Sequence, residues 1–373
     1  MCFVEFSGTA RMQLLKTILM KKVSVLAVLV LTLTACKKET KTITKTDPAT
    51  GETITVEVPA DSATASNTND ATIVSGQPAV YAENGVYKQS FKLEKGQTYP
   101  LITHQKDVQT LTGPDGKSQS GTSEMTDEMS FTVNDFKDGV YDISVNLLGK
   151  RNSQTANGQT VTVDTKQAAP KDEQLKMMWN VNKALIGNSL SMKMKQNGEV
   201  VSITGFDPIY TKVTAAVGTV LKDAKEKNAF AGSFKQSFNE KMLKDQFAKN
   251  LVLLPAKGVK KGESWTESEN ATPDGKIKLT TKYTLKSAGD GTAEITVAGG
   301  IPKKSDKNTQ EGITRTMSSE LSQNGNIVLD EATGWVKNQN VTVKTTQSET
   351  LSDGKQSQTM KSVSNSTVSV KGK

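Results

Sequence analysis

The chain has 373 residues, with 47 lysine and arginine residues against 39 aspartate and glutamate residues and a net charge of +8. The basic residues are dispersed and only 5% of residues are aromatic, which argues against a nucleic-acid partner because nucleic-acid-binding surfaces cluster basic and aromatic residues. One histidine and two cysteines exclude a Cys/His metal cluster, and no phosphate-binding glycine loop or nucleotide motif is present. We therefore predict no metal and no cofactor.

The first 36 residues are organised like a lipoprotein signal. Lys21 and Lys22 precede thirteen uncharged residues, 23–35, which fit the h-region of a secretory signal and fall short of the roughly 20 apolar residues of a membrane span. The run ends in Leu33-Thr34-Ala35-Cys36, which resembles the lipobox of bacterial lipoproteins. The resemblance implies that signal peptidase II cleaves before Cys36 and that lipid on this cysteine anchors the protein in a membrane.

Residues 1–35 are thus the expected signal peptide, and we expect translation to start at Met20, where a complete signal begins. Removing residues 1–35 takes away four basic residues and one acidic residue, which leaves 43 basic against 38 acidic residues and a net charge of +5. No free thiol remains, which excludes disulfides. By analogy with the best-known sorting rule, Lys37 after the lipidated cysteine favours the outer membrane, and the face it occupies there stays open.

Residues 36–80 are predicted to be a flexible tether. Thr, Lys, Ser, Ala, Asn and Asp dominate this stretch, and its apolar content is too low to offset the entropy of ordering. Within it, residues 42–44 and 53–58 alternate around residues 47–51, which predicts a small hairpin of marginal stability.

Two regions, 81–206 and 255–373, have the texture of antiparallel β-sheet with one exposed face. Short alternating runs predict strands at 130–133, 141–145, 161–163, 279–285, 293–297, 341–343 and 368–370. Dipeptides that accept positive φ in tight turns separate the runs: Asp115-Gly116, Asp138-Gly139, Asn157-Gly158, Asn197-Gly198, Asp274-Gly275, Asp290-Gly291, Asn324-Gly325 and Asp353-Gly354.

The two β regions resemble each other, which predicts an internal duplication. At an offset of 152 residues, Phe131, Val133, Asp138, Gly139, Ile143 and Val145 correspond to Tyr283, Leu285, Asp290, Gly291, Ile295 and Val297. At an offset of 127, Ser191, Met194, Gln196, Asn197 and Gly198 correspond to Ser318, Leu321, Gln323, Asn324 and Gly325. Upstream, Lys95-Gly96-Gln97-Thr98-Tyr99 corresponds to Lys261-Gly262-Glu263-Ser264-Trp265.

Helices are predicted inside the first β unit and between the two units. An inserted helix, 171–187, ends at Gly187, and a helical segment, 207–254, begins with Asp207 as N-cap and Pro208 as its first residue. The predicted fold class is α+β: mainly antiparallel, with two duplicated curved sheet units and amphipathic helices packed between or over them.

Five aromatic residues are candidates for the lining of a ligand cavity between helices and sheet. Phe230, Phe234 and Phe238 follow one another at helical spacing, and Trp179 and Phe247 lie on the neighbouring helical stretches. Two interpretations stay open, because these rings could line a cavity or could simply fill the core under the sheet.

No residue is predicted to be catalytic. His104 is the single histidine and no Gly-x-Ser-x-Gly motif accompanies it, so a structural or exposed histidine is the simpler interpretation. The acid pairs Asp127/Glu128 and Asp330/Glu331 are predicted to be turn residues that stabilise loop backbone.

The lipobox, the tether, the duplicated unit and the run from Asn324 to Asp330 followed by Thr333-Gly334-Trp335 together resemble an uncharacterised family of Bacteroidota lipoproteins, classed as a domain of unknown function. The likeness covers most of residues 85–350 and implies no catalytic residue. A curved sheet with covering helices is also similar to the LolA-like lipid carriers, by architecture alone.

These features predict a non-enzymatic, lipid-anchored envelope lipoprotein that binds a hydrophobic ligand or an envelope protein. The alternative is a passive structural scaffold of the envelope, and a hydrolase is a third and weaker hypothesis.

Overall fold

The computed structural model describes residues 40–46, 53–59, 76–272, 275 and 277–372. The predicted signal peptide, the predicted lipidation site Cys36 and the predicted turn at 47–51 therefore lie outside the described residues. The chain divides into two compact units, one of residues 1–77 with 269–279 and one of residues 78–268 with 280–373. The fold is α+β and mainly antiparallel, which confirms the predicted fold class.

In the first unit, β1 (Thr40–Thr46) and β2 (Thr53–Pro59) form an antiparallel hairpin. Ile43 pairs with Val56, in agreement with the hairpin predicted from the alternation of these residues.

The second unit holds the long strands, except for residues 269–270 and 278–279 of two of them, which belong to the first unit. Two short strands precede them and pair with a third, giving a small sheet of β3 (Val80–Glu83), β4 (Val86–Gln89) and β11 (Val259–Lys260). The strands of the large sheet are β5 (Thr98–Thr112), β6 (Ser118–Lys137), β7 (Val140–Ala156), β8 (Gln159–Asp164), β9 (Ser189–Lys195), β10 (Val200–Thr204), β12 (Ser264–Asn270), β13 (Lys278–Ser287), β14 (Thr292–Gln310), β15 (Ile313–Asp330), β16 (Val336–Ser352) and β17 (Ser357–Lys371).

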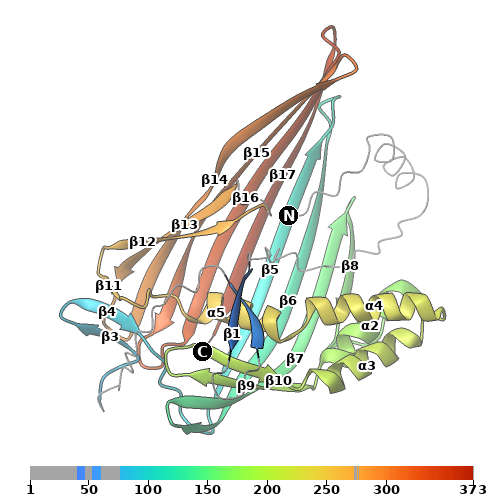
Figure 1. The fold of residues 1–373 in the computed structure, drawn as a ribbon. Helices are drawn as coiled ribbons and strands as arrows, with labels where there is room; N and C mark the ends of the chain where they lie inside the picture. Colours follow the sequence, from blue (N-terminus) through green and yellow to red (C-terminus); the bar gives the residue numbers. More distant parts are fainter. Residues whose placement is uncertain (1–39, 47–52, 60–75, 273–274, 276, 373) are drawn as a thin grey trace. The chain divides into compact units, whose positions relative to one another are not determined.

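The large sheet has twelve strands in the order β10-β9-β7-β6-β5-β17-β16-β15-β14-β13-β12, and β8 pairs with the far end of β7. The pairing of β5 with β17 joins the strands of the first predicted β unit to those of the second. The two predicted units therefore share one continuous sheet (Figure 1).

Four helices are described: α2 (Glu173–Leu185), α3 (Phe206–Gly218), α4 (Ala224–Ser237) and α5 (Glu240–Leu251). Side-chain caps begin three of them, because Asp172, Asp223 and Asn239 each accept a backbone N–H of the first turn. The predicted cap Asp207 is wrong: α3 starts at Phe206, two residues before the predicted Pro208, and its N-cap is Gly205, whose positive φ of 98° turns the chain out of β10.

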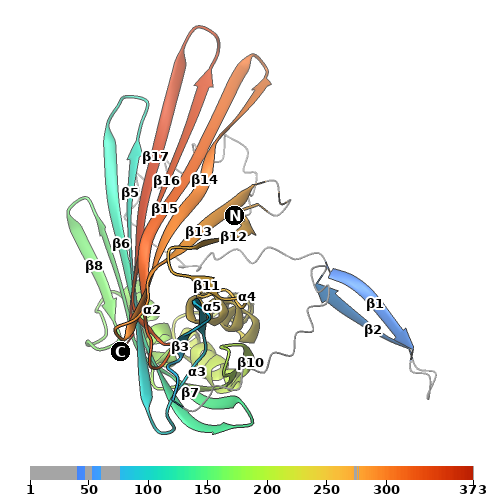
Figure 2. The same cartoon turned by 90° about the vertical axis from the view of Figure 1, so that its left-hand side faces the viewer.

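Helices cover the sheet only at one end of its long strands. Figures 1 and 2 show α2, α3, α4 and α5 on a single side of the sheet, with the far ends of β5, β6 and β14 to β17 extending beyond them. Burial agrees, since the buried residues of β15 are Ile327 and Leu329 and that of β17 is Val370. We call the face that bears Phe131, Ile295 and the residues in register with them the helix face.

Two hairpins of the sheet repeat the same geometry. In the β6–β7 hairpin, Phe131 pairs with Val145 and Val133 with Ile143, and a bulge follows. In the β13–β14 hairpin, a bulge likewise follows the pairs Tyr283–Val297 and Leu285–Ile295. Both turns place an aspartate and then a glycine at positive φ: Asp138 at 53° and Gly139 at 76°, and Asp290 at 58° and Gly291 at 82°.

The segments that lead into the two hairpins also match. Gly96 donates its N–H to Val133 O at 2.8 Å, and Gly262 donates to Leu285 O at 2.7 Å. In return, Val133 donates to Gln97 O and Leu285 to Glu263 O. Both glycines have a φ near 80°. The correspondence at an offset of 152 residues is thus a correspondence of backbone geometry.

The correspondence at an offset of 127 residues has no such counterpart. Gly198 lies in the turn between β9 and β10, whereas Gly325 lies inside β15 and pairs with Val297 and Val341. In register, the residue of β9 that occupies the place of Gly325 is Leu190, which pairs with Val145. The prediction of a turn at Asn324-Gly325 is therefore wrong, because strand pairing on both sides outweighs the turn preference of the dipeptide.

Candidate functional site

An aromatic cluster fills the space between the helices and the sheet. Trp335, fully buried after the β15–β16 turn, lies against Phe91, Tyr99 and Phe131 with ring centroids 6.3, 5.5 and 5.1 Å away. Its indole N–H donates to Pro100 O at 3.3 Å. The turn brings the backbone so close to Ser90 that only glycine fits at position 334, where a Cβ would overlap the Ser90 carbonyl oxygen.

Two buried tyrosines hold residues 91–94 onto this cluster. The Tyr141 hydroxyl donates to Phe91 O at 2.9 Å and accepts from Leu93 N at 3.2 Å, and the Tyr99 hydroxyl accepts from Glu94 N at 3.0 Å. Burial raises the pKa of both phenols, because the charged phenolate loses solvation. These hydroxyls therefore stay protonated and act as fixed hydrogen-bonding groups.

The phenylalanine stripe forms the rim of the core. Phe230, Phe234 and Phe238 are half-buried and stack with ring centroids 6.4 and 5.6 Å apart. Tyr210 and Phe206 of α3 meet Phe234 and Phe238 edge to face. Phe238 is the C-cap of α4, so the stripe ends where α4 ends and α5 begins.

The structure does not bring Trp179 and Phe247 to this stripe. Trp179 donates its indole N–H to Asp164 O at 3.0 Å, at the end of β8, and Lys183 lies 5.8 Å from its ring. Phe247 is buried and meets Phe131 edge to face at 5.4 Å. Among the described residues, the five predicted aromatics are thus spread over three places.

Two hollows are described, and neither is lined by the five aromatics. The smaller, about 190 Å³, lies between the end of α5 and the sheet and is lined by Ala248, Lys249, Val252, Leu253, Glu267 and Tyr283. Beside it, Trp265 stacks on Tyr283 at 5.4 Å. The Trp265 indole nitrogen is buried and has no hydrogen-bond partner among the described residues.

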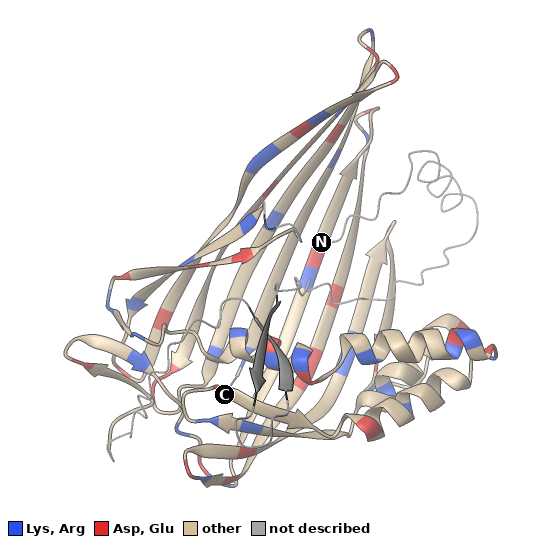
Figure 3. Cartoon of the chain, in the orientation of Figure 1, with Lys and Arg blue, Asp and Glu red and all other residues tan. Residues whose placement is uncertain are grey.

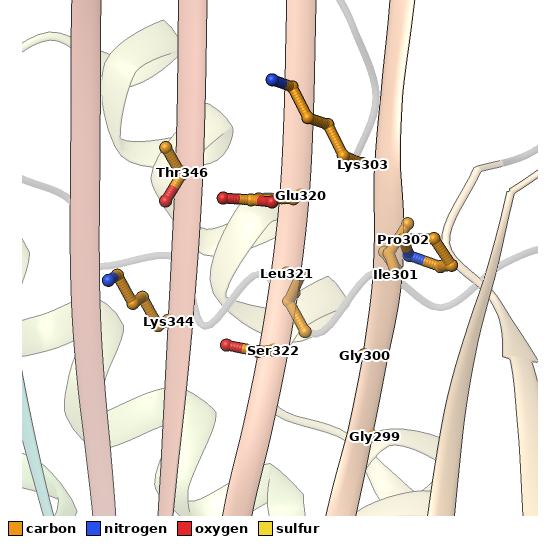
Figure 4. A pocket seen from close by; sticks show the side chains of 10 residues that line it. All are labelled: Gly299, Gly300, Ile301, Pro302, Lys303, Glu320, Leu321, Ser322, Lys344 and Thr346. Atoms are coloured by element: carbon orange, nitrogen blue, oxygen red, sulfur yellow. The ribbon is translucent and has the colours of Figure 1, made fainter.

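The larger hollow, about 450 Å³, lies on the sheet where β14 has a bulge between Ile301 and Lys304. Figure 4 shows its lining with the helices behind the strands. The register places Gly300, Ser322 and Lys344 on the face opposite the helices. The rim is charged and no aromatic ring contributes to the lining, so the hollow offers polar contacts on an open surface.

The far ends of the strands present apolar side chains on the helix face, beyond the helices. The register places six residues there, which we call the distal apolar patch: Leu111, Ile313, Met317, Leu321, Leu351 and Met360. Leu111, Ile313, Leu351 and Met360 are 37, 51, 43 and 37% exposed. Within the patch, Arg315 pairs with Glu349 at 2.6 Å. Sequence reasoning missed this patch because its members are scattered between residues 111 and 360.

The opposite face of the same strand ends is covered by hydroxyl pairs. Thr110 bonds Ser120, Ser318 bonds Ser348 and Thr350 bonds Thr359, at 2.8 to 2.9 Å. These cross-strand pairs stabilise a sheet layer that has no core beneath it. Exposed apolar side chains are thus concentrated on the helix face of the strand ends.

His104 and the acid pairs occupy structural positions. The His104 ring nitrogen lies 3.0 Å from Thr126 Oγ1, on the face opposite the helices. Asp330 and Glu331 stabilise turns as predicted, since Asp330 accepts Thr333 N and Glu331 accepts Gly289 N and Gly291 N. The prediction of turn residues is wrong for the other acid pair, Asp127 and Glu128.

Asp127 and Glu128 lie within β6 and form ion pairs at 2.6 Å, Asp127 with Lys150 of β7 and Glu128 with Lys166, which follows β8. Among the described residues, no group of three or more His, Cys, Asp or Glu side chains could hold a metal ion. In the same part of the chain, every helix is too short or too polar to cross a membrane.

Comparison with known proteins yields one family and distant structures. The model of DUF6263, described as a family of unknown function, matches residues 138–336, more than half of the chain. No curated protein matches the sequence. A lipovitellin structure concerned with lipid–protein interactions is similar over 76% of this chain, with 11% identity and a TM-score of 0.35. The match covers 25% of the lipovitellin chain, so this chain spans about a quarter of its length.

Two bacterial structures are more distant. An outer membrane channel from Pseudomonas putida F1 is 10% identical, with a TM-score of 0.18. The match covers 78% of this chain and 99% of the channel chain. Pseudomonas aeruginosa OccK7 is 5% identical with a TM-score of 0.16, and covers 74% of this chain and 99% of its own.

Proposed function

Since the chain belongs to DUF6263, a family of unknown function, we propose from its geometry that it is a lipid-anchored, non-enzymatic binding protein of the cell envelope whose ligand is another envelope protein. The observation that carries this proposal is the distal apolar patch, on a part of the sheet that none of the four described helices covers. Exposed apolar and methionine side chains around an arginine are typical of protein interfaces.

A protein partner is a better fit than an amphiphile held inside the fold. The space under the helices is filled by Trp335 and the rings around it. Small-molecule sites usually measure about 300 to 1,000 Å³ and are mostly apolar. The hollow beside α5 is smaller than that, and the hollow at Gly300 is open and has a charged rim.

The anchor in this proposal is Cys36, after the lipobox-like run Leu33-Thr34-Ala35, and Lys37 favours the outer membrane of a Bacteroidota-type envelope. Incorporation of labelled palmitate tests the anchor directly. We expect labelling of the full chain and loss of labelling in Cys36→Ser. Labelling that persists in the serine variant would contradict the lipid anchor and leave the proposed binding surface untouched.

Photo-cross-linking in cells tests the binding surface. A photoreactive residue at Leu351, in the patch, is compared with one at Thr350, its neighbour on the opposite face. We expect a discrete adduct with one envelope protein from position 351, none from position 350, and loss of the adduct when Met360→Asp is added. Equal adducts from both positions, or none from position 351, would argue against this surface.

A passive scaffold is the second candidate, and the observation that favours it is the filled core under the helices. Under that hypothesis, the distal apolar patch has no specific partner, so positions 350 and 351 behave alike. The cross-linking pair therefore separates the two candidates. Neither candidate assigns a catalytic residue.

We also infer that β5–β7 and β12–β14 descend from one duplicated unit. The shared register, the paired bulges, the Asp-Gly turns and the two glycine-led openings support this inference. The insertion that contains α2 to α5 follows the first copy only.

A further inference from the structure

Most free edges described in the large sheet are protected against pairing with another strand. Beyond Gly300, β14 pairs with β15 alone, and this stretch carries Pro302, Lys303 and Lys307 together with a bulge. Figure 3 shows Lys and Arg positions in blue along β14. Proline, lysine and bulges are the devices by which edge strands resist further pairing.

The edge of β10 is blocked by side chains of α5. Lys244 donates to Val201 O at 2.6 Å, and Glu240 accepts Ile203 N at 3.2 Å. At the far side of the sheet, β12 carries the acidic Glu267. Each of these edges therefore presents charge or is already hydrogen-bonded.

Between residues 159 and 163, the edge of β8 has no such protection. Residues 159–163 read Gln-Thr-Val-Thr-Val and carry no charge, and Val161 is 43% exposed. β8 pairs with β7 and with no other strand of the described chain. The hairpin turn, Asn157 and Gly158, has two residues at positive φ, which sets the pattern of hydrogen bonds that follows.

In such a hairpin, hydrogen-bonded and non-hydrogen-bonded pairs alternate along the strands, and the pair next to the turn is hydrogen-bonded. Here that first pair is Ala156–Gln159. The pairs Gln154–Val161 and Asn152–Val163 are therefore hydrogen-bonded, and the backbone groups of Thr160, Thr162 and Asp164 point away from β7. Asp164 supports this assignment, because its C=O accepts Trp179 Nε1 and Gln167 N from the outer side.

We propose that β8 pairs with β8 of a second copy of this chain, antiparallel and centred on Val161, so that one sheet continues through both molecules. This proposal is independent of the proposed function. The occupant is a second copy because the edge is self-complementary about a two-fold axis at Val161. Thr160 of one copy then faces Thr162 of the other, and each such pair exchanges two backbone hydrogen bonds.

Charge and shape agree with this register. Val161 meets its own counterpart in a central pair without hydrogen bonds, where side chains approach most closely. Pairing ends before Asp164, because its outward C=O already accepts Trp179 Nε1 and Gln167 N. The paired residues, 159–163, carry no charge, so no like charges face each other. Threonine pairs and pairs of β-branched residues across strands are stabilising.

Sedimentation equilibrium of the full chain in detergent tests the proposal, with two double variants as a matched pair. Thr160→Lys with Thr162→Lys places like charges opposite each other twice, and Thr160→Lys with Thr162→Glu places opposite charges there. We expect a dimer for the natural chain and for the Lys/Glu variant, and a dimer dissociation constant raised about tenfold or more for the Lys/Lys variant. Circular dichroism checks that both variants fold.

A cross-link locates the contact. In the full chain with Cys2 and Cys36 replaced by serine, Val161→Cys is expected to form a disulfide-linked dimer under mild oxidation, because residues of a central pair lie within disulfide reach. Leu148→Cys, which replaces a side chain of similar exposure, 48%, is expected to stay monomeric in the same assay. A natural chain that stays monomeric, a dimer indifferent to the Lys/Lys variant, or equal cross-linking at both positions would overturn the proposal.

Discussion

Tyr141 links the sheet to the segment that closes over the aromatic cluster. Its ring is buried beside Phe136 and its hydroxyl bonds both Phe91 O and Leu93 N. A buried phenol that both donates and accepts satisfies two backbone groups, which would otherwise be costly to bury. The same burial raises the pKa of Tyr141, so ionisation opposes folding.

Tyr141→Phe is expected to lower the free energy of unfolding by about 1–3 kcal/mol at pH 7, because two buried backbone groups lose their partner. A pKa raised by folding contributes stability that is complete below the unfolded-state value, about 10, and is lost as the pH rises through the folded-state value. The difference in free energy of unfolding between the natural chain and Tyr141→Phe should therefore become smaller above about pH 10.

Urea unfolding at pH 7 and at alkaline pH measures both effects. Tyr81→Phe is the control, since no hydrogen bond is described for the Tyr81 hydroxyl within residues 76–372. An equal loss of stability in the two variants would show that the Tyr141 hydroxyl has no special role.

At the scale of elements, glycines set the close approach of strands near the bulge of β14. A Cβ would overlap a carbonyl oxygen of the neighbouring strand at each of three positions, Gly299, Gly300 and Gly325. Glycine inside a strand often marks such a bend or close approach. These residues allow the sheet to bend just before the helix-free strand ends.

Gly300→Ala is expected to destabilise the protein by about 2–4 kcal/mol, because the new Cβ meets the Leu321 carbonyl oxygen, which belongs to a paired strand and cannot move freely. Gly232→Ala is expected to raise the free energy of unfolding by about 0.5–1 kcal/mol, since Gly232 lies in α4 with open space around it. Thermal unfolding of both variants checks the pair, and a neutral Gly300→Ala would show that the strands can separate there.

At the scale of the large sheet, stability is expected to decline from the helices toward the strand ends. β6 alone has 20 residues, roughly 68 Å at about 3.4 Å per residue, and the core lies under one end of it. Beyond the core, the strands rely on backbone pairing, hydroxyl pairs and ion pairs such as Arg315–Glu349. Such interactions contribute less than buried apolar area.

Hydrogen exchange measures this gradient. Amides of β15 and β16 near Ile327 and Val336 should exchange only by global unfolding, and those near Met317 and Glu349 should exchange faster through local opening. Uniform protection along β15 would contradict the gradient and would indicate that the strand ends are covered in solution.

The sequence by itself determined the strands, the helical segments and the turns at Asp138-Gly139 and Asp290-Gly291, because these depend on side-chain period and on local φ preference. It also predicted the repeat of the two hairpins, since matching residues produce matching registers.

Only the tertiary structure decided that β5 pairs with β17, that Asn324-Gly325 lies within a strand, and that the phenylalanines pack against the core cluster. Backbone hydrogen bonds between strands far apart in the chain carry no sequence period. Whether an apolar stripe lines a cavity or fills one depends on side chains that arrive from other elements, such as Trp335.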